Sequence, residues 1–212
     1  MHFAAVIFDL DGVIVSTDEF HYVSWKSIAV EEKIPFNRDI NNQLRGVSRM
    51  ESLEIILENA ARPYSNEEKL TLASKKNEIY RKSLQELTAE NLLDGVQETL
   101  LALKKRGIKI AIGSSSKNTA MILKQVGLAE LFDAVADGID ITNSKPHPEV
   151  FLTAAKKLGV NPATCLVVED ADSGVEAGLA AGMKVAGVGQ AAANPKATYA
   201  VTSVKEILEF VG

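Results

Sequence analysis

The chain of 212 residues has almost no cysteine and no excess of positive charge, and each shortage excludes a class of protein. Its single cysteine, Cys165, cannot form an internal disulfide, so a disulfide-stabilised scaffold is excluded and a reducing, cytoplasmic setting is expected. Cys165 lies in the apolar run 164–168 and is expected to be an inert thiol in a buried strand. The formal net charge of −5 gives no electrostatic reason to expect nucleic acid or an anionic membrane surface as a partner.

Long hydrophobic runs, internal repeats and low-complexity segments are also missing. The longest early apolar stretch, residues 3–8, is stopped by Asp9 and is too short and too early for a signal peptide or a membrane span. Hydrophobic residues make up 46% of the chain and charged residues 24%, a balance typical of soluble globular proteins. We therefore expect a cytoplasmic, monomeric globular protein with no membrane or nucleic-acid partner.

Four apolar runs rich in β-branched residues predict the buried strands of a parallel sheet. They cover residues 3–8, 108–112, 166–168 and 185–188, and polar or glycine residues follow each of them. Helical patterns lie between and after them, at residues 118–126, 149–158, 175–181 and 204–211. This alternation predicts a doubly wound, Rossmann-like α/β sheet with helices on both faces, whose ligands sit beyond the carboxyl ends of the strands.

The spacing of the polar strand ends predicts a second, inserted domain. A strand–helix unit takes about 30 residues, and the 31 residues from Ser114 to Lys145 fit one such unit. The interval from Asp9 to Ser114 spans 105 residues, and its excess carries helix formers at 18–33, 49–60 and 66–87. We predict a core domain of residues 1–16 and 93–212 and a helical cap domain of residues 17–92, hinged near residues 15–17 and 92–94.

Two acidic pairs that follow predicted strands indicate a metal site. Asp9 and Asp11 point to the same side of an extended segment, where their like charges need a balancing cation or a functional proton. Glu169 and Asp170 close another strand, so four carboxylates converge if the two strands are neighbours. Oxygen ligands select a hard cation, and Mg²⁺ is the usual ion where phosphate also binds. Exposed loop aspartates are the alternative interpretation of the first pair.

Hydroxyl groups and a lysine supply a candidate anion site. The run 114–118, Ser-Ser-Ser-Lys-Asn, follows a predicted strand and opens a helix, where free N–H groups attract anions. Ordinary serine N-capping is the alternative interpretation. Lys145, which precedes a proline, falls in the interval where the next strand should end. Further on, Ser173 and Glu176 have the spacing of a capping box, which predicts a structural role for both.

Together these motifs resemble the haloacid-dehalogenase-like superfamily of phosphotransferases, and the match covers the whole chain. The resemblance implies that Asp9 is a nucleophile that becomes an aspartyl phosphate and that Asp11 is the general acid/base. It implies that Ser114 and Lys145 bind the transferring phosphoryl group. It also implies a set of Mg²⁺ ligands, which are Asp9, the backbone carbonyl of Asp11, Glu169 and Asp170. Ala171 departs from the serine that the family commonly carries there, so a hydroxyl beside the metal ligands is missing.

Segments 17–26, 44–52 and 114–118 narrow the resemblance to the β-phosphoglucomutase family. That family interconverts β-glucose 1-phosphate and glucose 6-phosphate, with glucose 1,6-bisphosphate as intermediate and activator. The resemblance implies a phosphosugar substrate and a set of residues that bind it or set the cap, namely Thr17, His21, Trp25, Gly46, Val47, Arg49, Ser52, Lys76, Ser115, Ser116, Lys117 and Asn118. Within this set, Arg49, Ser116 and Asn118 correspond to the site of the phosphate that is not transferred.

Several cap residues can also be interpreted without the resemblance. A capping box at 48–51 places Arg49 in the first turn of a helix, where a cation opposes the helix dipole unless an anion binds. Lys76 has no acidic residue three or four positions away, so it either faces the cleft or snorkels at the rim of an apolar stripe. His21 fits a surface position of a helix equally well, and Trp25 fits packing.

Other functions use a similar set of residues. In a small-molecule phosphatase on the same scaffold, water attacks phospho-Asp9 in place of a sugar hydroxyl. A phospho-accepting signalling module shares the strand-end aspartate, the acidic Mg²⁺ ligands and the lysine, but the long helical insertion argues against it. The complete set of acids, hydroxyl and lysine disfavours a catalytically silent binding protein.

Overall fold

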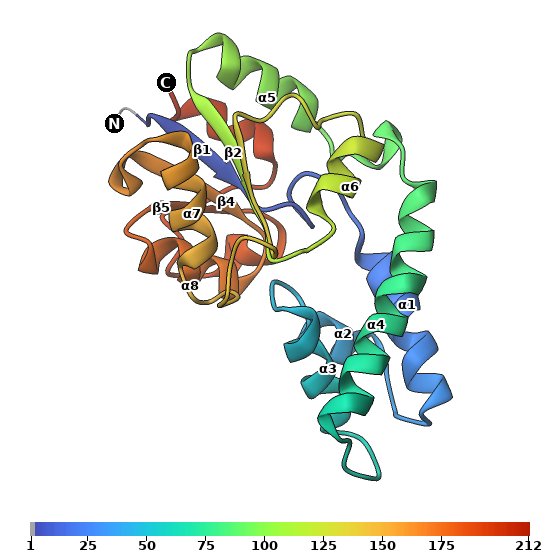
Figure 1. The fold of residues 1–212 in the computed structure, drawn as a ribbon. Helices are drawn as coiled ribbons and strands as arrows, with labels where there is room; N and C mark the ends of the chain where they lie inside the picture. The colour runs from blue at the N-terminus through green and yellow to red at the C-terminus, as the bar shows by residue number, and fades with distance from the viewer. Residues whose placement is uncertain (1–2) are drawn as a thin grey trace.

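The computed structural model describes residues 3–212 and places six parallel strands in one sheet (Figure 1). In chain order the strands are β1 (Ala5–Phe8), β2 (Lys109–Gly113), β3 (Ala134–Ala136), β4 (Cys165–Glu169), β5 (Lys184–Gly187) and β6 (Tyr199–Ala200). Their order across the sheet is β3-β2-β1-β4-β5-β6. Phe8 pairs with Ile112 on one side and with Val168 on the other. The three central strands therefore end level, and the residues that follow them meet at one edge of the sheet.

Helices cover both faces of the sheet, because side chains along each strand alternate between the faces. On one face, Val6 and Phe8 pack into a buried cluster that includes side chains of α5 (Val96–Lys105) and α6 (Thr119–Gln125). On the other face, Ala5 and Ile7 pack with side chains of α7 (Glu149–Leu158) and α8 (Asp172–Ala180). The predicted doubly wound α/β sheet is thus confirmed.

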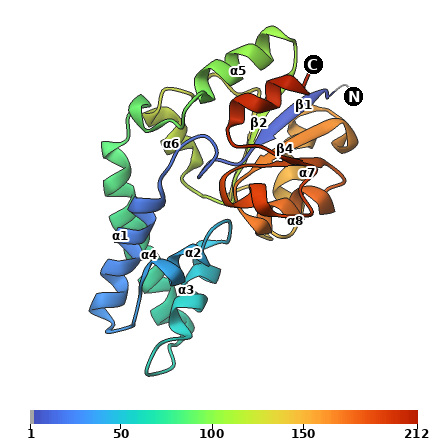
Figure 2. The same ribbon diagram turned by 180° about the vertical axis from the view of Figure 1, so that it is seen from behind.

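Four helices form a separate region on the side of the sheet where the strands end (Figures 1 and 2). They are α1 (Asp18–Glu31), α2 (Arg38–Asn42), α3 (Arg49–Leu57) and α4 (Asn66–Ser83). This region has its own apolar core, which includes Trp25, Ile28 and Leu53. The predicted capping box is present, since Ser48 caps the N-terminus of α3 and the Glu51 side chain accepts from the Ser48 N–H at 2.8 Å. The helical cap is therefore confirmed, whereas its boundaries at residues 17 and 92 stay a prediction.

The chain leaves the sheet for the cap and returns through two adjacent segments. Val15 forms an antiparallel bridge with Leu92, and the Leu93 N–H donates to the Ile14 carbonyl at 3.0 Å. Between α4 and α5 the chain makes two short 3₁₀ helices, Leu84–Glu86 and Ala89–Asn91. Residues 15 and 92 therefore lie side by side where the predicted hinge falls.

Several elements differ from the prediction. The four predicted strands are present within two residues of their expected bounds, but β3 and β6 were not predicted, and neither were α2 and α5. The segment 204–211 forms a 3₁₀ helix, Val204–Glu209, and two more such helices lie at Pro162–Thr164 and Gly189–Ala193. No helix within residues 3–212 combines the length and the apolar character needed to cross a membrane.

The predicted capping box at Ser173 and Glu176 is wrong. Helix α8 begins at Asp172, with Ala171 in the N-cap position and no side-chain cap. Ser173 is thus already inside the first turn, and its buried Oγ has no hydrogen-bond partner. The carboxylate of Glu176 instead accepts from Lys196 Nζ at 2.8 Å. Neither side chain caps the helix: that of Ser173 is buried in the first turn, and that of Glu176 forms an ion pair.

Candidate active site

Three buried carboxylates meet where β1 and β4 end. Asp9 follows β1, Glu169 is the last residue of β4, and Asp170 follows it. Each offers an oxygen atom, and these atoms all lie within 4.8 Å of one another. Within residues 3–212 no other group of acidic, histidine or cysteine side chains is arranged in this way. The parallel pairing of β1 with β4 thus brings together the two acidic pairs of the sequence.

Lys145 forms ion pairs with two of these carboxylates, those of Asp9 and Glu169. Its Nζ lies 2.5 Å from Asp9 Oδ1 and 2.5 Å from Glu169 Oε1, and the side chain is completely buried. Burial alone would lower the pKa of Lys145, but the two carboxylates raise it above its ordinary value. Burial raises the pKa of Asp9 to about 7, although Lys145 opposes the shift. The lysine is therefore a fixed positive charge beside Asp9.

The cluster suits a hard divalent cation, because all of its donors are carboxylate oxygens and they are only partly neutralised by Lys145. Burial, together with the charges of Glu169 and Asp9, raises the pKa of Asp170 to about 8, as expected for crowded buried carboxylates. Gly12 leaves the space that Asp170 needs, since a Cβ at Gly12 would lie 2.1 Å from Asp170 Oδ2. The carboxylate of Asp11 lies outside the cluster.

Asp11 is instead turned toward the cap, where Thr17 and His21 contact its carboxylate. Its Oδ1 accepts from the Thr17 N–H at 2.9 Å and from the Thr17 hydroxyl, and its Oδ2 lies 3.5 Å from His21 Nε2. Tyr80 extends the network through its hydroxyl, which lies 2.9 Å from Thr17 Oγ1. Burial would raise the pKa of Asp11, but His21 and Thr17 hold it below its ordinary value. The network thus favours an ionised Asp11, which can accept a proton.

Lys76 is buried among aromatic rings and, within residues 3–212, has no carboxylate partner. Its Nζ lies 2.8 Å from His21 Nδ1, 4.4 Å from the centre of the Tyr80 ring and 5.0 Å from that of Trp25. Only 2% of the residue is exposed, so the snorkelling alternative is wrong. Burial and the charge of Arg49 lower the pKa of Lys76 to about 7. A protonated Lys76 has only donors, so the ring proton of a neutral His21 lies on Nε2, facing Asp11.

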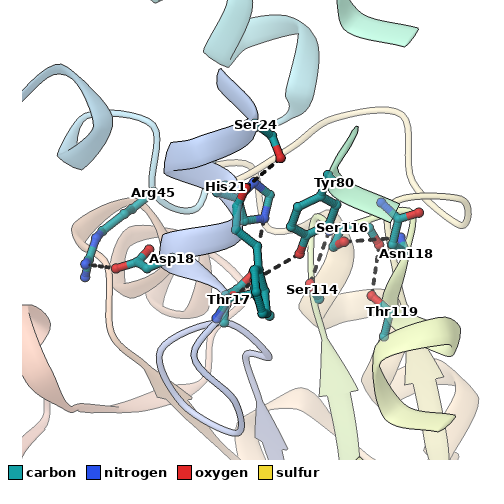
Figure 3. Close-up of polar contacts among 12 residues, drawn as sticks. Thr17, Asp18, His21, Ser24, Arg45, Tyr80, Ser114, Ser116, Asn118 and Thr119 are labelled. Carbon is teal, nitrogen blue, oxygen red and sulfur yellow. Dashed lines mark hydrogen bonds and ion pairs between the residues drawn. The ribbon is translucent and has the colours of Figure 1, made fainter. Parts of the chain in front are cut away.

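The serine-rich loop after β2 folds back on its own backbone. Ser114 Oγ accepts from the Ser116 N–H at 3.1 Å, and Ser116 Oγ accepts from the Asn118 N–H at 3.1 Å (Figure 3). The Asn118 side chain donates to Asn77 Oδ1 on α4 at 3.0 Å, which joins this loop to the cap. The alternative of ordinary serine N-capping is wrong, because the N-cap of α6 is Asn118 and it makes no side-chain cap hydrogen bond. The serine loop lines the cavity described next.

A cavity of about 990 Å³ lies between the sheet edge and the cap. The core contributes side chains of Asp9, Asp11, Asp170 and residues 114–118. Among the predicted cap residues, those that line the cavity are His21, Trp25, Gly46, Val47, Arg49, Ser52 and Lys76. Lys145 and Glu169 are buried and do not line the cavity. Lys145 contacts Asp9, which does line it. Thr17 is fully buried and does not line the cavity, so its contact with Asp11 makes it a positioning residue and not a substrate contact.

Arg49 is a second cation of the cap that lines this cavity, and within residues 3–212 it has no carboxylate partner. It occupies the first position of α3, lines the cavity, and within residues 3–212 forms no ion pair. Partial burial lowers its pKa from the ordinary value, although a guanidinium stays charged at neutral pH. A buried cation at the positive end of a helix is unfavourable unless an anion binds there.

Four further residues belong to the site although the sequence did not single them out: Asp18, Arg45, Asn77 and Tyr80. Arg45 lies within hydrogen-bond distance of Asp18 (Figure 3). It also lies 3.4 Å from Asp170. Tyr80 lies one helical turn after Lys76, so the helical spacing of α4 was a usable signal for it. Arg45 and Asn77 make contacts with residues 125 and 41 positions away, and no local pattern predicts such contacts.

The parallel sheet, its acidic strand ends and the covered cavity define a capped α/β enzyme whose buried carboxylate cluster suits a metal ion. A model of the family described as haloacid dehalogenase-like hydrolase matches residues 6–188. The chain therefore belongs to the haloacid dehalogenase-like hydrolase family.

Individual relatives narrow this assignment. The chain is 47% identical to the β-phosphoglucomutase of Bacillus subtilis over 188 residues, which cover 88% of this chain and 83% of that protein. It is 32% identical to the phosphorylated carbohydrates phosphatase of Thermotoga maritima over 85% of this chain and 82% of that protein. The crystal structure of β-phosphoglucomutase from Clostridium difficile superposes with a TM-score of 0.93 at 40% identity, covering 98% of this chain and 95% of that one.

Proposed function

We propose that this protein is a β-phosphoglucomutase that interconverts β-glucose 1-phosphate and glucose 6-phosphate through an aspartyl-phosphate enzyme and glucose 1,6-bisphosphate. The observation that carries the proposal is that one cavity has two places for a phosphate. One lies beside Asp9, with Lys145 behind it and Ser114 nearby. The other lies at Arg49, a partly buried cation that forms no ion pair within residues 3–212 and faces the same cavity as Ser116 and Asn118. A sugar bisphosphate has two phosphates to match.

The residues of the core then take the roles that phosphoryl transfer needs. The Asp9 carboxylate attacks phosphorus, and the aspartyl phosphate that forms divides one difficult displacement into two easier ones. Lys145, whose positive charge is fixed beside Asp9, stabilises the charge that develops on the transferring group. Asp9, Glu169, Asp170 and the Asp11 carbonyl would hold the cation, for which we propose Mg²⁺. When bound, it neutralises charge on the phosphoryl oxygens.

Asp11, which faces the cap, supplies the proton transfer, and two cap residues hold it in place. A substrate hydroxyl attacks the phosphoryl group of phospho-Asp9, and Asp11 accepts the hydroxyl proton. The bisphosphate turns round, its other phosphoryl group returns to Asp9, and Asp11 gives the proton to the oxygen that leaves. Thr17 and His21 hold the Asp11 carboxylate. The cap covers the cavity, which limits the access of water to phospho-Asp9.

A phosphatase that acts on phosphorylated sugars is the second candidate. It is favoured by the 32% identity to a phosphatase of phosphorylated carbohydrates. The chemistry differs only in whether water or a sugar hydroxyl attacks phospho-Asp9. A phosphatase acting on a monophosphate has no use for the second phosphate place at Arg49, which is why the mutase is preferred.

Phosphorus NMR distinguishes the two functions. The purified protein is mixed with β-glucose 1-phosphate, Mg²⁺ and a catalytic amount of glucose 1,6-bisphosphate. We expect the signal of glucose 6-phosphate to grow while inorganic phosphate stays near its starting level. Accumulation of inorganic phosphate at the rate of substrate loss would make the protein a phosphatase. If neither product formed, a signalling or binding role would replace both.

A further inference from the structure

Arg45, in the loop between α2 and α3, reaches from the cap to the acidic cluster of the core. Its Nη1 lies 3.4 Å from Asp170 Oδ2, and its Nη2 contacts Asp18 Oδ2 on α1. Its Nε is buried and has no hydrogen-bond partner. Only 10% of the Asp170 side chain and 30% of the Arg45 side chain are exposed, so little water separates the two charges. The loop therefore places a positive charge against the carboxylates that would hold a metal ion.

The neighbouring residue shows that this loop fits closely against the core. The Ser115 hydroxyl donates to the Gly46 carbonyl at 3.3 Å. Gly46 has a φ of +74°, and a Cβ there would lie 2.4 Å from Ser173 Oγ. A side chain at this position would therefore push the loop away from α8. The glycine at position 46 thus allows the loop to approach α8 closely enough for Arg45 to contact Asp170.

We propose that Arg45 is a positioning residue that competes with the divalent cation for the Asp170 carboxylate. Binding of the cation therefore weakens the contact of the cap loop with the core, and this contact weakens binding of the cation. This inference rests on the metal site of the proposed function. Within residues 3–212, Arg45 is the only cap cation that lies within 4 Å of a carboxylate of the cluster formed by Asp9, Glu169 and Asp170. Lys145, the other partner of that cluster, belongs to the core.

The competition follows from charge. The guanidinium partly neutralises Asp170, which weakens the attraction of this carboxylate for a second cation. A bound divalent ion would in turn repel Arg45 across a few ångströms of largely buried space, where screening is weak. Because linkage is reciprocal, an ion that weakens the contact of Arg45 with Asp170 is itself weakened by that contact to the same extent. Asp18 gives the displaced guanidinium a partner within the cap.

The proposal is tested by titrating MgCl₂ into the full chain without substrate in a calorimeter. Arg45→Ala and Arg45→Gln both remove the charge, and the glutamine keeps most of the length. We expect both variants to bind Mg²⁺ at least about fivefold more tightly than the wild type, at the lower end of typical coupling between sites. Arg45→Lys keeps the charge and should bind within about threefold of the wild-type affinity. Circular dichroism checks that each variant is folded.

Arg49→Ala is the matched control, because it removes the same charge from the same cap at a residue with no ion pair to the cluster. Its Mg²⁺ affinity should stay within about twofold of the wild type. The proposal is overturned if Arg45→Ala and Arg45→Gln bind Mg²⁺ as the wild type does or more weakly, or if Arg49→Ala tightens binding equally. If the wild type bound no Mg²⁺ at all, the proposed cofactor would fail as well, and this result is distinct from unchanged affinities.

Discussion

The core and the cap differ in whether the buried cations beside the cavity have carboxylate partners. In the core, Lys145 lies 2.5 Å from two carboxylates, so its charge is paired within the protein. In the cap, Lys76 is buried and Arg49 is partly buried beside the cavity, and neither has a carboxylate partner within the part of the chain that the structure describes. Burial accordingly lowers the pKa of both cap residues, whereas the pKa of Lys145 is raised.

The difference separates a cation that is already neutralised within the protein from cations that an anionic ligand would neutralise. A buried ion pair is satisfied before any substrate arrives, so Lys145 orients Asp9 in the free protein. An unpaired buried cation costs stability and is relieved when an anion binds. The core is therefore preorganised for chemistry, and under the proposed function a phosphate-bearing ligand pairs with the positive charge of the cap.

The largest expected effect comes from removing the paired carboxylate of the core. Asp9→Asn should lower turnover by roughly 10⁴-fold or more, because the amide is not a nucleophile for phosphorus. The fold should be retained, since Lys145 keeps Glu169 as a partner. Steady-state kinetics and trapping of the phosphoenzyme measure the effect. More than trace turnover in the folded variant would show that no phosphate bond to Asp9 is needed.

The next effect concerns Asp11, which lies between core and cap. Asp11→Asn should lower mutase turnover by about 10²–10⁴-fold, the usual contribution of a general acid/base. Acetyl phosphate has a good leaving group and needs little proton transfer, so this variant should still form phospho-Asp9 from it. Mass spectrometry of the intact protein detects the added phosphoryl group. Equal loss of both reactions would show that Asp11 maintains the structure of the site and does not transfer the proton.

A smaller effect is expected from the cap cation Arg49. Arg49→Ala should lower kcat/KM for β-glucose 1-phosphate by about 10–100-fold, which corresponds to the roughly 1.5–3 kcal/mol of a hydrogen bond to a charged group. Arg49→Lys should recover only part of this, since lysine cannot form the two parallel hydrogen bonds of a guanidinium.

The matched reaction for Arg49 is phosphorylation of Asp9 by acetyl phosphate, which carries a single phosphate. Its rate should change by less than about threefold in both Arg49 variants. If Arg49→Ala slowed this reaction as much as the sugar phosphate reaction, Arg49 would be a structural residue of the cap, and the two phosphate places would be reduced to one.

The smallest effect is on stability and concerns Lys76. Its pKa in the folded protein is lowered to about 7 from 10.5, so between these pH values the unfolded chain binds a proton that the folded protein does not. Stability therefore rises with pH in this window, and the full cost of the buried charge is present below about pH 7. Lys76→Met should raise the free energy of unfolding by about 1–3 kcal/mol at pH 7.

Urea unfolding of wild type and Lys76→Met at several pH values checks this sign. The advantage of the variant should shrink between pH 7 and pH 9, because the wild type gains stability there. An advantage that grew with pH, or a variant less stable than the wild type at pH 7, would contradict an unpaired buried charge at this position.

The acidic residues of the core site could be predicted because they stand at strand ends, places that the sheet itself determines, whereas Lys145 lies in a loop nine residues after β3. A buried strand is readable from its apolar residues, and in a parallel sheet neighbouring strands end at one edge. The residues after the runs 3–8 and 166–168 had to meet once β1 and β4 were neighbours. The strands β3 and β6, of three and two residues, are too short to give such a signal.

The parts that could not be predicted depend on contacts between distant segments. Arg45 reaches a residue 125 positions away, and Thr17 moved from an expected substrate contact to a support for Asp11 because its side chain is buried beneath the cavity. The spacing of Ser173 and Glu176 matched a capping box, yet packing against Gly46 and an ion pair with Lys196 decided where they lie. The segment 204–211 fits α and 3₁₀ helices alike, since Val204 and Ile207 are three residues apart.

The adjacent crossings at residues 15 and 92 make the helical region a removable insert. Because Val15 and Leu92 are bridged, a chain that turned directly from one to the other would leave every strand of the sheet and every sheet pairing in place. Inserting or exchanging a segment between such close ends changes the entropy of loop closure only slowly with its length. The acidic sheet edge can thus be combined with different inserted segments, so that the cavity lining can change while the strand-end residues stay in place.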